Sequence, residues 1–170
     1  MLSKAIQTIR EGKKDQQGQV ILSGLEDILF HHIIDDFDLD LIDLTKQSKA
    51  QSKDKAHNAQ ILREFIQQQK NLNKGIAAVD VLQDIVQNIA YTLLYQDVFT
   101  RISKTMLNLG GGKSTSQKNI RDLIPIFFPI NGIYSLVTIP KKVRSCITDQ
   151  LNSPELQPYW KDTLSLGWIY

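Results

Sequence analysis

The chain has 170 residues, of which 42% are hydrophobic and 22% charged, the composition of a globular domain with a sizeable core. Its net charge of +2 is too small to indicate a nucleic-acid partner by itself. The single cysteine, Cys146, excludes an internal disulfide and fits a reducing compartment. No apolar signal-peptide core opens the chain, and prolines, Asn131 and Gly132 interrupt its longest apolar stretch, residues 123–140. We therefore expect no membrane segment and a cytoplasmic location.

The N-terminal part of the chain predicts two helices. Leu2, Ile6 and Ile9 have the spacing of a short first helix, which the polar residues 13–18 end. Residues 20–37 then place their apolar side chains on one stripe and predict an amphipathic helix.

A polar region separates this part from the centre. Residues 38–44 alternate polar and apolar, which fits either a short strand or a turn into the next helix. Residues 45–60 have almost no large apolar side chain and predict a solvated helix or a flexible linker. An apolar helix face returns at residues 61–66.

The longest regular element is predicted over residues 76–108, where apolar residues recur with a period close to 3.6. At 1.5 Å per residue such a helix is roughly 50 Å long. A triglycine at 110–112 ends it, within a flexible segment 109–118. No strand pattern with a hairpin turn is evident. We expect one mainly α domain over residues 1–170, irregular and built on this central helix, with shorter helices at 120–127, at 141–151 and from 162 onward.

Several motifs resemble ligand sites but lack essential parts. Residues 109–114 resemble a phosphate-binding loop, yet Leu107 stands where the motif needs its first glycine and a helix precedes the loop. His31, His32 and Asp35 lack further ligands, and the calcium-loop pattern at 36–47 lacks its glycine and its final glutamate. The chain lacks the aspartate followed by a Glu/Asp-x-Lys triplet that a metal-dependent nuclease needs. No Ser-His-Asp or Cys-His nucleophile system can be assembled either. We therefore predict no catalytic residue, no metal site and no cofactor in this chain.

Clustered basic residues are the candidates for DNA contact, because Lys and Arg neutralise backbone phosphates without reading sequence. The alternative is a solvated lysine-rich face. Residues 46–64 contain no Trp or Tyr that could stack on bases. The candidates are Lys46, Lys49, Lys53, Lys55, Lys141, Lys142 and Arg144.

Aromatic residues gather at the C-terminus, where Tyr159, Trp160, Trp168 and Tyr170 lie within twelve residues. Trp and Tyr are enriched both in cores and where two protein surfaces meet. The chain also stops without a polar tail or a helix cap, so we expect it to be the N-terminal part of a longer protein. These four residues are the candidates for contact with a following domain or a partner protein.

The same region carries a family resemblance. Pro154-Glu-Leu-Gln-Pro-Tyr-Trp-Lys-Asp162, followed by Leu166-Gly-Trp-Ile-Tyr170, resembles a segment of large bacterial adenine-N6 DNA methyltransferases of the restriction–modification and BREX-like phage-exclusion type. Ala90-Tyr-Thr-Leu-Leu-Tyr-Gln-Asp-Val-Phe-Thr-Arg-Ile102 is similar to a second helix of that family, although Tyr95-Gln96-Asp97 departs from the usual Phe-Asn-Arg.

The resemblance implies a helical region that precedes the methylase core. The parent protein would then use S-adenosylmethionine to methylate adenine in double-stranded DNA. That chemistry needs an Asn/Asp-Pro-Pro-Tyr/Phe loop. The prolines of this chain are never adjacent, so the sequence lacks this loop. We therefore expect a structural or DNA-positioning module that contacts the rest of the parent polypeptide. The alternative is a free-standing helical protein–protein interaction domain.

Overall fold

The computed structural model describes residues 2–47, 52–109 and 132–161, with side chains for all of these except 103–109. Across these ranges the chain is mainly α-helical, as the sequence predicts, and its only sheet is a two-stranded hairpin. In chain order the elements are α1 (Leu2–Glu11), β1 (Gly12–Lys14), β2 (Val20–Ser23), α2 (Leu25–Phe37), α3 (Lys53–Leu72), α4 (Ala78–Leu109), the 3-10 turn η1 (Gly132–Leu136), α6 (Lys141–Leu151), the 3-10 turn η2 (Pro154–Leu156) and α7 (Gln157–Lys161).

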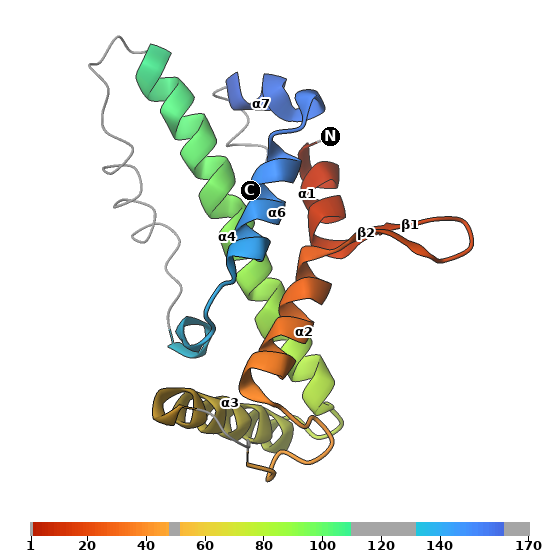
Figure 1. Ribbon diagram of the computed structural model, residues 1–170, viewed down its shortest axis with the longest axis vertical. Helices are drawn as coiled ribbons and strands as arrows, with labels where there is room; N and C mark the ends of the chain where they lie inside the picture. Colours follow the sequence, from red (N-terminus) through yellow and green to blue (C-terminus); the bar gives the residue numbers. More distant parts are fainter. Residues whose placement is uncertain (1, 48–51, 110–131, 162–170) are drawn as a thin grey trace.

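The central helix is α4, which confirms the element predicted over residues 76–108. It has 32 residues and crosses the molecule from end to end (Figure 1). Asp80 stabilises its start, because the carboxylate accepts a hydrogen bond of 3.1 Å from the N–H of Ala77 just before the helix. Its buried residues recur every three or four positions, and those described are Ala78, Val81, Leu82, Ile85, Val86, Ile89, Ala90, Leu93, Leu94, Val98 and Ile102.

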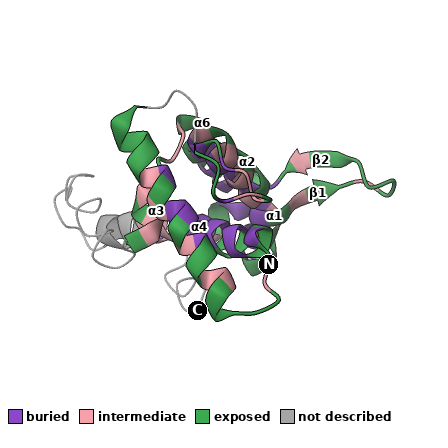
Figure 2. Cartoon of the chain, turned by 90° about the horizontal axis from the view of Figure 1, so that it is seen from below, coloured by how far each residue is buried: buried purple, intermediate pink, exposed green. Residues whose placement is uncertain are grey.

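The other helices bury their apolar faces against α4. Helix α2 packs along it, α1 and α6 lie beside α2, and α3 runs across the lower end of α2 and α4 (Figure 1). Buried residues therefore concentrate between the helices, while the outer faces are exposed (Figure 2). The largest fully buried side chains of α2, Leu25, Leu29, Ile33 and Phe37, follow the spacing of one helix face.

The hairpin corrects the prediction of one helix over residues 20–37. Strands β1 and β2 pair antiparallel, and α2 begins only at Leu25. The expectation that the chain lacks a hairpin was therefore wrong. Val20 and Ile21 are β-branched and favour a strand once β1 offers a pairing edge. Ile21, which the helical pattern placed on the buried stripe, is 62% exposed.

The polar region after α2 is a turn rather than a strand. Asp38 has a positive φ of 49°, and its N–H donates to the carbonyl of Ile34, which ends α2. Leu39 and Leu44 fold back into the core. In the predicted flexible segment 45–60, residues 53–60 form the first turns of α3, and they are exposed except for Asn58, which is half-buried, and Ala59, which is buried. The solvated-helix alternative fits that part of the segment.

Helix α6 coincides with the helix predicted at 141–151, and it buries Val143, Ile147 and Leu151. The predicted helices at 120–127 and from 162, and the triglycine at 110–112, lie outside the described residues. In the ranges that the structure describes, no helix combines the length and apolar character needed to cross a bilayer.

We predict that Gly12→Ala destabilises the protein by about 3 kcal/mol, because a left-handed backbone and a steric clash act together. Gly12 has a φ of 80°, and an added Cβ would lie 2.3 Å from the carbonyl oxygen of Leu22. Gly18 has the same φ with nothing within 4 Å, so Gly18→Ala isolates the backbone cost of about 1 kcal/mol. Urea unfolding measures both free energies. Equal losses would contradict the close packing at the base of the hairpin.

Candidate nucleic-acid interface

The two basic clusters predicted from the sequence differ in their ion pairs. Lys46 Nζ lies 3.2 Å from Asp40 Oδ2, and Lys55 Nζ lies 2.6 Å from Asp36 Oδ1. The charges of both lysines are thus compensated within the chain. Lys53 is exposed and forms no ion pair with a described residue, and Lys49 lies outside the described residues.

Asp40, the partner of Lys46, is a carboxylate whose charged form is favoured by its hydrogen bonds. The backbone N–H groups of Asp43 and Ile42 donate hydrogen bonds to Asp40, and these bonds, with a smaller contribution from Lys46, hold the pKa of Asp40 below its ordinary value. Asp40 therefore stays charged well below neutral pH. A phosphate approaching Lys46 would have to compete with this fixed negative charge.

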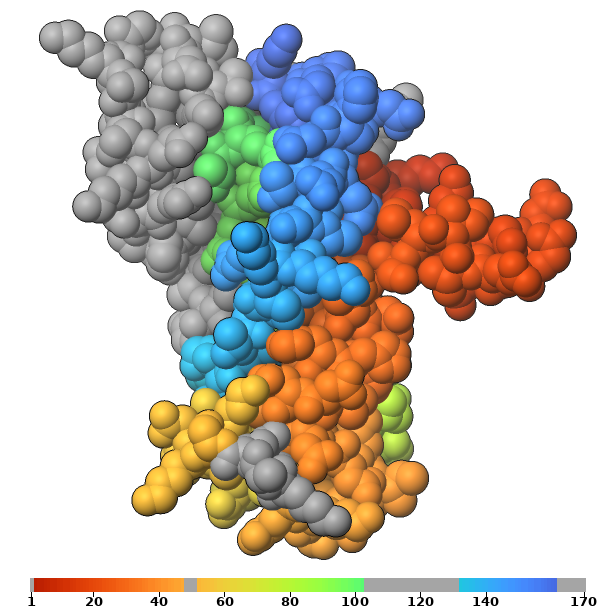
Figure 3. All heavy atoms as spheres, in the orientation of Figure 1, coloured from red at the N-terminus to blue at the C-terminus, as the bar shows by residue number. Residues whose placement is uncertain are grey.

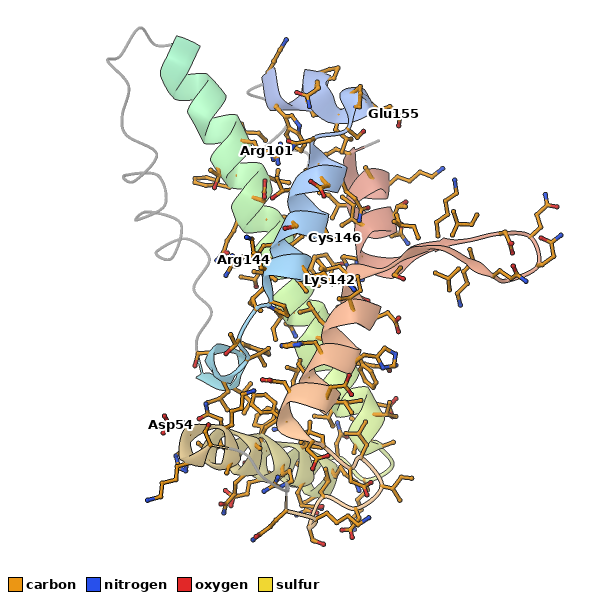
Figure 4. All side chains as sticks on the ribbon, in the orientation of Figure 1. Asp54, Arg101, Lys142, Arg144, Cys146 and Glu155 are labelled. Carbon is orange, nitrogen blue, oxygen red and sulfur yellow. The ribbon has the colours of Figure 1, made fainter. Side chains whose placement is uncertain are left out.

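The cations of α6 have no such compensation. Lys141, Lys142 and Arg144 are exposed at the start of the helix, and none of them forms an ion pair with the described residues. The first turn has no acidic side chain, and Pro140 supplies no side-chain cap. Figure 4 shows Lys142 and Arg144 on opposite sides of α6, as their spacing of two residues requires.

The electrostatics of this helix end are unusual. A helix N-terminus carries about half a positive charge, so cations are ordinarily disfavoured there. The N–H groups of Lys141 and Lys142 also donate to no backbone carbonyl of the described chain. Positive charge and N–H groups without a described backbone acceptor therefore coincide around the first turn of α6, which we call the α6 cationic end (Lys141, Lys142 and Arg144).

Both ends of α6 are fixed to the helical body. Before the helix, His32 Nε2 of α2 lies 3.0 Å from the carbonyl oxygen of Thr138. After it, the guanidinium of Arg101 on α4 donates to Asn152 Oδ1 at 2.6 Å and also forms an ion pair with Asp97. The α6 cationic end is therefore presented by a helix that the core holds in place.

The two described C-terminal aromatic candidates, Tyr159 and Trp160, differ in burial. Trp160 is only 5% exposed, and its indole N–H donates to the carbonyl of Leu151 at 3.0 Å. The guanidinium of Arg101 lies 5.6 Å from its ring centroid. The prediction of Trp160 as a partner contact is thus corrected, because this side chain closes the core over α4. Tyr159 is half-buried, and Trp168 and Tyr170 lie outside the described residues.

Sequence reasoning missed a buried charge at the junction of three helices. Arg10 is 7% exposed, and its Nε lies 2.6 Å from Glu26 Oε1 of α2. It also donates to the hydroxyl of Tyr91 on α4, with its guanidinium carbon 3.9 Å from that ring's centroid. In the sequence Arg10 is only a polar residue near a helix end, so its partners 16 and 81 residues away gave no signal.

A depression of about 550 Å³ beside Arg10 has the opposite charge character to the α6 cationic end. Its lining from α2 and α4 includes Glu26, Asp27 and Asp84. Asp27 pairs with His31 at 3.3 Å. Among the described residues, no group of three or more His, Cys, Asp or Glu side chains comes together as a metal site. This depression is unsuited to phosphate because its carboxylates would repel it.

Comparison with known proteins gives no relative: no family model, curated protein or solved structure matches the chain. The resemblance to adenine-N6 DNA methyltransferases therefore rests on the motifs quoted above. Residues 90–102 of that resemblance lie in α4, and residues 154–161 form η2 and α7.

We predict that Arg10→Ala lowers the free energy of unfolding by about 3 kcal/mol, because Glu26 is left without its partner in a mostly buried site. Tyr91→Phe is the matched control. It removes one hydrogen bond, keeps the ring under the guanidinium and should cost about 1 kcal/mol. Guanidinium unfolding monitored by circular dichroism measures both. A loss for Arg10→Ala no larger than for Tyr91→Phe would mean that the Arg10–Glu26 pair contributes little.

Proposed function

We propose that the chain is a non-catalytic helical module that positions double-stranded DNA through the α6 cationic end. We further propose that it belongs to the N-terminal region of an adenine-N6 DNA methyltransferase-like protein of the restriction–modification or phage-defence type. The observation that carries the DNA role is the concentration of positive charge at the start of α6, which no carboxylate of the described residues pairs with.

The spacing of these cations suits a phosphate backbone. Lys141 and Arg144 are three residues apart, which is about 4.5 Å along a helix axis. Duplex DNA carries one phosphate charge per roughly 1.7 Å of its axis, so each cation can meet a different phosphate. The N–H groups of Lys141 and Lys142, which donate to no described backbone carbonyl, add donors of the kind that bind phosphate at helix N-termini.

The contrast with Lys46 and Lys55 favours a binding role over simple solvation. Those lysines are held by carboxylates of the same chain at 3.2 and 2.6 Å. The α6 cations have no carboxylate partner among the described residues and instead oppose the helix dipole, which costs folding energy. An anionic partner would remove this cost, and a solvated face would not.

The resemblance connects the DNA role to methyl transfer elsewhere in the parent protein. Helix α4, which carries residues 90–102, packs against both α6 and α7. The described motif residues in α4 and α7 and the α6 cationic end thus belong to one packed unit. The parent protein would bind S-adenosylmethionine and flip adenine with other residues, and this module would hold the duplex in place.

The alternative of a protein–protein interaction domain has less support from the described residues, because one of its four candidate residues is in the core. It relied on the C-terminal aromatic residues, and Trp160 is in the core. Among the described candidates, Tyr159 keeps partial exposure. We therefore favour DNA as the partner.

We predict that the purified chain binds a duplex of about 20 base pairs at about 50 mM salt and much more weakly at about 200 mM. Replacing Lys141, Lys142 and Arg144 by Ala should lower the slope of log affinity against log salt by about 2.7, because three phosphate contacts are lost. Fluorescence anisotropy with a labelled duplex measures the slope.

The matched control removes the same charge from the other cluster, as Lys46→Ala, Lys53→Ala and Lys55→Ala together. It should change the slope by less than half as much, since Lys46 and Lys55 are already ion-paired. Equal effects of the two triple variants would contradict the assignment to α6. Absence of binding by the unaltered chain at the lower salt would contradict a DNA role and favour the protein-interaction alternative.

A further inference from the structure

The hairpin β1–β2 projects from the helical body as a narrow arm. In Figures 1 and 3 it leaves the junction of α1 and α2 and stands clear of the other described elements. Gly12 and Gly24 fix its base, because an added Cβ at Gly24 would lie 2.4 Å from the carbonyl carbon of Glu11. The arm is thus anchored at its root and free along its length.

The tip of the arm is ordered by one carboxylate. Asp15 Oδ1 accepts hydrogen bonds from the N–H groups of Gln17 at 2.9 Å and Gln19 at 2.8 Å. The N–H of Asp15 also donates to the carbonyl of Gln19 at 2.8 Å. The only acidic side chain between Gly12 and Ser23 is therefore occupied inside the loop. The amides of Gln16, Gln17 and Gln19 are left exposed.

The flanks of the arm combine positive charge with apolar side chains. Lys13 and Lys14 are exposed and form no ion pair within the described ranges. A β-bulge makes Val20 the pairing partner of Lys14 and leaves Ile21 as the extra residue of β2. Val20 and Ile21 are 60% and 62% exposed, far more than side chains of this kind are in a core.

We infer that this arm enters the major groove of duplex DNA and favours A·T base pairs. The inference rests on the proposed function and adds a base preference to it. A two-stranded ribbon fits the major groove, which is about 12 Å wide and 8.5 Å deep. Each side of the arm has about five residues at about 3.3 Å each, so the tip reaches farther than the groove is deep.

The side chains of the arm match the chemistry of A·T pairs. A glutamine amide can donate to adenine N7 and accept from its N6 amino group, and apolar side chains contact the thymine methyl. Both features lie in the major groove. Lys13 and Lys14 would meet the phosphates at the groove edge. Gln16, Gln17, Val20 and Ile21 would then reach the base edges.

The experiment compares three duplexes of equal length in the binding assay: one rich in A·T, the same one with uracil in place of thymine, and one rich in G·C. Uracil removes only the major-groove methyl groups. The unaltered chain should bind the thymine duplex about fourfold more tightly than the uracil duplex, the value of one buried methyl contact. It should bind the A·T-rich duplex about tenfold more tightly than the G·C-rich one.

Variants of the arm should remove these preferences without unfolding the chain, because the altered side chains are exposed. Val20→Ala with Ile21→Ala should abolish the thymine-over-uracil preference, and Gln16→Ala with Gln17→Ala should reduce the A·T preference. Gln83→Ala with Gln87→Ala, two exposed glutamines of α4, is the matched control and should change neither ratio. Thermal unfolding checks that all variants fold.

The outcomes separate this inference from the proposed function. Equal binding of the three duplexes, with the α6 triple variant still weakening all of them, would overturn the base preference and leave the DNA role intact. An equal loss on the thymine and uracil duplexes for Val20→Ala with Ile21→Ala would also overturn it. No binding to any duplex would overturn both.

Discussion

The fold depends on how one buried guanidinium is held between three helices. Arg10 of α1 pairs with Glu26 of α2 and reaches Tyr91 of α4, so it fixes the junction where the chain turns from one helix into the hairpin. A charge that is 7% exposed is tolerated only because its partners are in place. Two residues further on, Gly12 begins the arm. The buried Arg10–Glu26 pair therefore lies next to the base of the arm.

The surfaces of the chain differ in whether their charged side chains are paired with a described residue of opposite charge. The loop after α2 neutralises Lys46 with a carboxylate whose pKa its own backbone holds low. The depression beside Arg10 carries acidic side chains. The start of α6 carries cations that no described carboxylate balances and that the helix dipole opposes. The net charge of +2 does not indicate these differences, because binding depends on where the charges lie on the surface and not on their sum.

The sequence is informative where local periodicity decides the structure. Helices α1 and α4 follow from apolar spacing and α6 from the prolines on either side of it, and the mainly α class follows with them. The hairpin was missed because Val20 and Ile21 also fit a helical stripe, and only pairing with β1 selects the strand. Contacts between residues far apart in the sequence could not be predicted either. Nothing near Trp160 in the sequence indicates that Arg101 and Leu151 close over it, and nothing near Lys55 indicates its carboxylate partner on α2.

The central claim, that the start of α6 binds duplex DNA, is tested most directly by hydrogen–deuterium exchange at single-residue resolution with and without the duplex. The N–H groups of Lys141 and Lys142 donate to no backbone carbonyl of the described chain, so they should exchange quickly in the free protein and slowly in the complex. The N–H groups at the start of α3 should be unchanged. Protection that appears at α3 and the preceding turn, with no change at Lys141 and Lys142, would contradict the account.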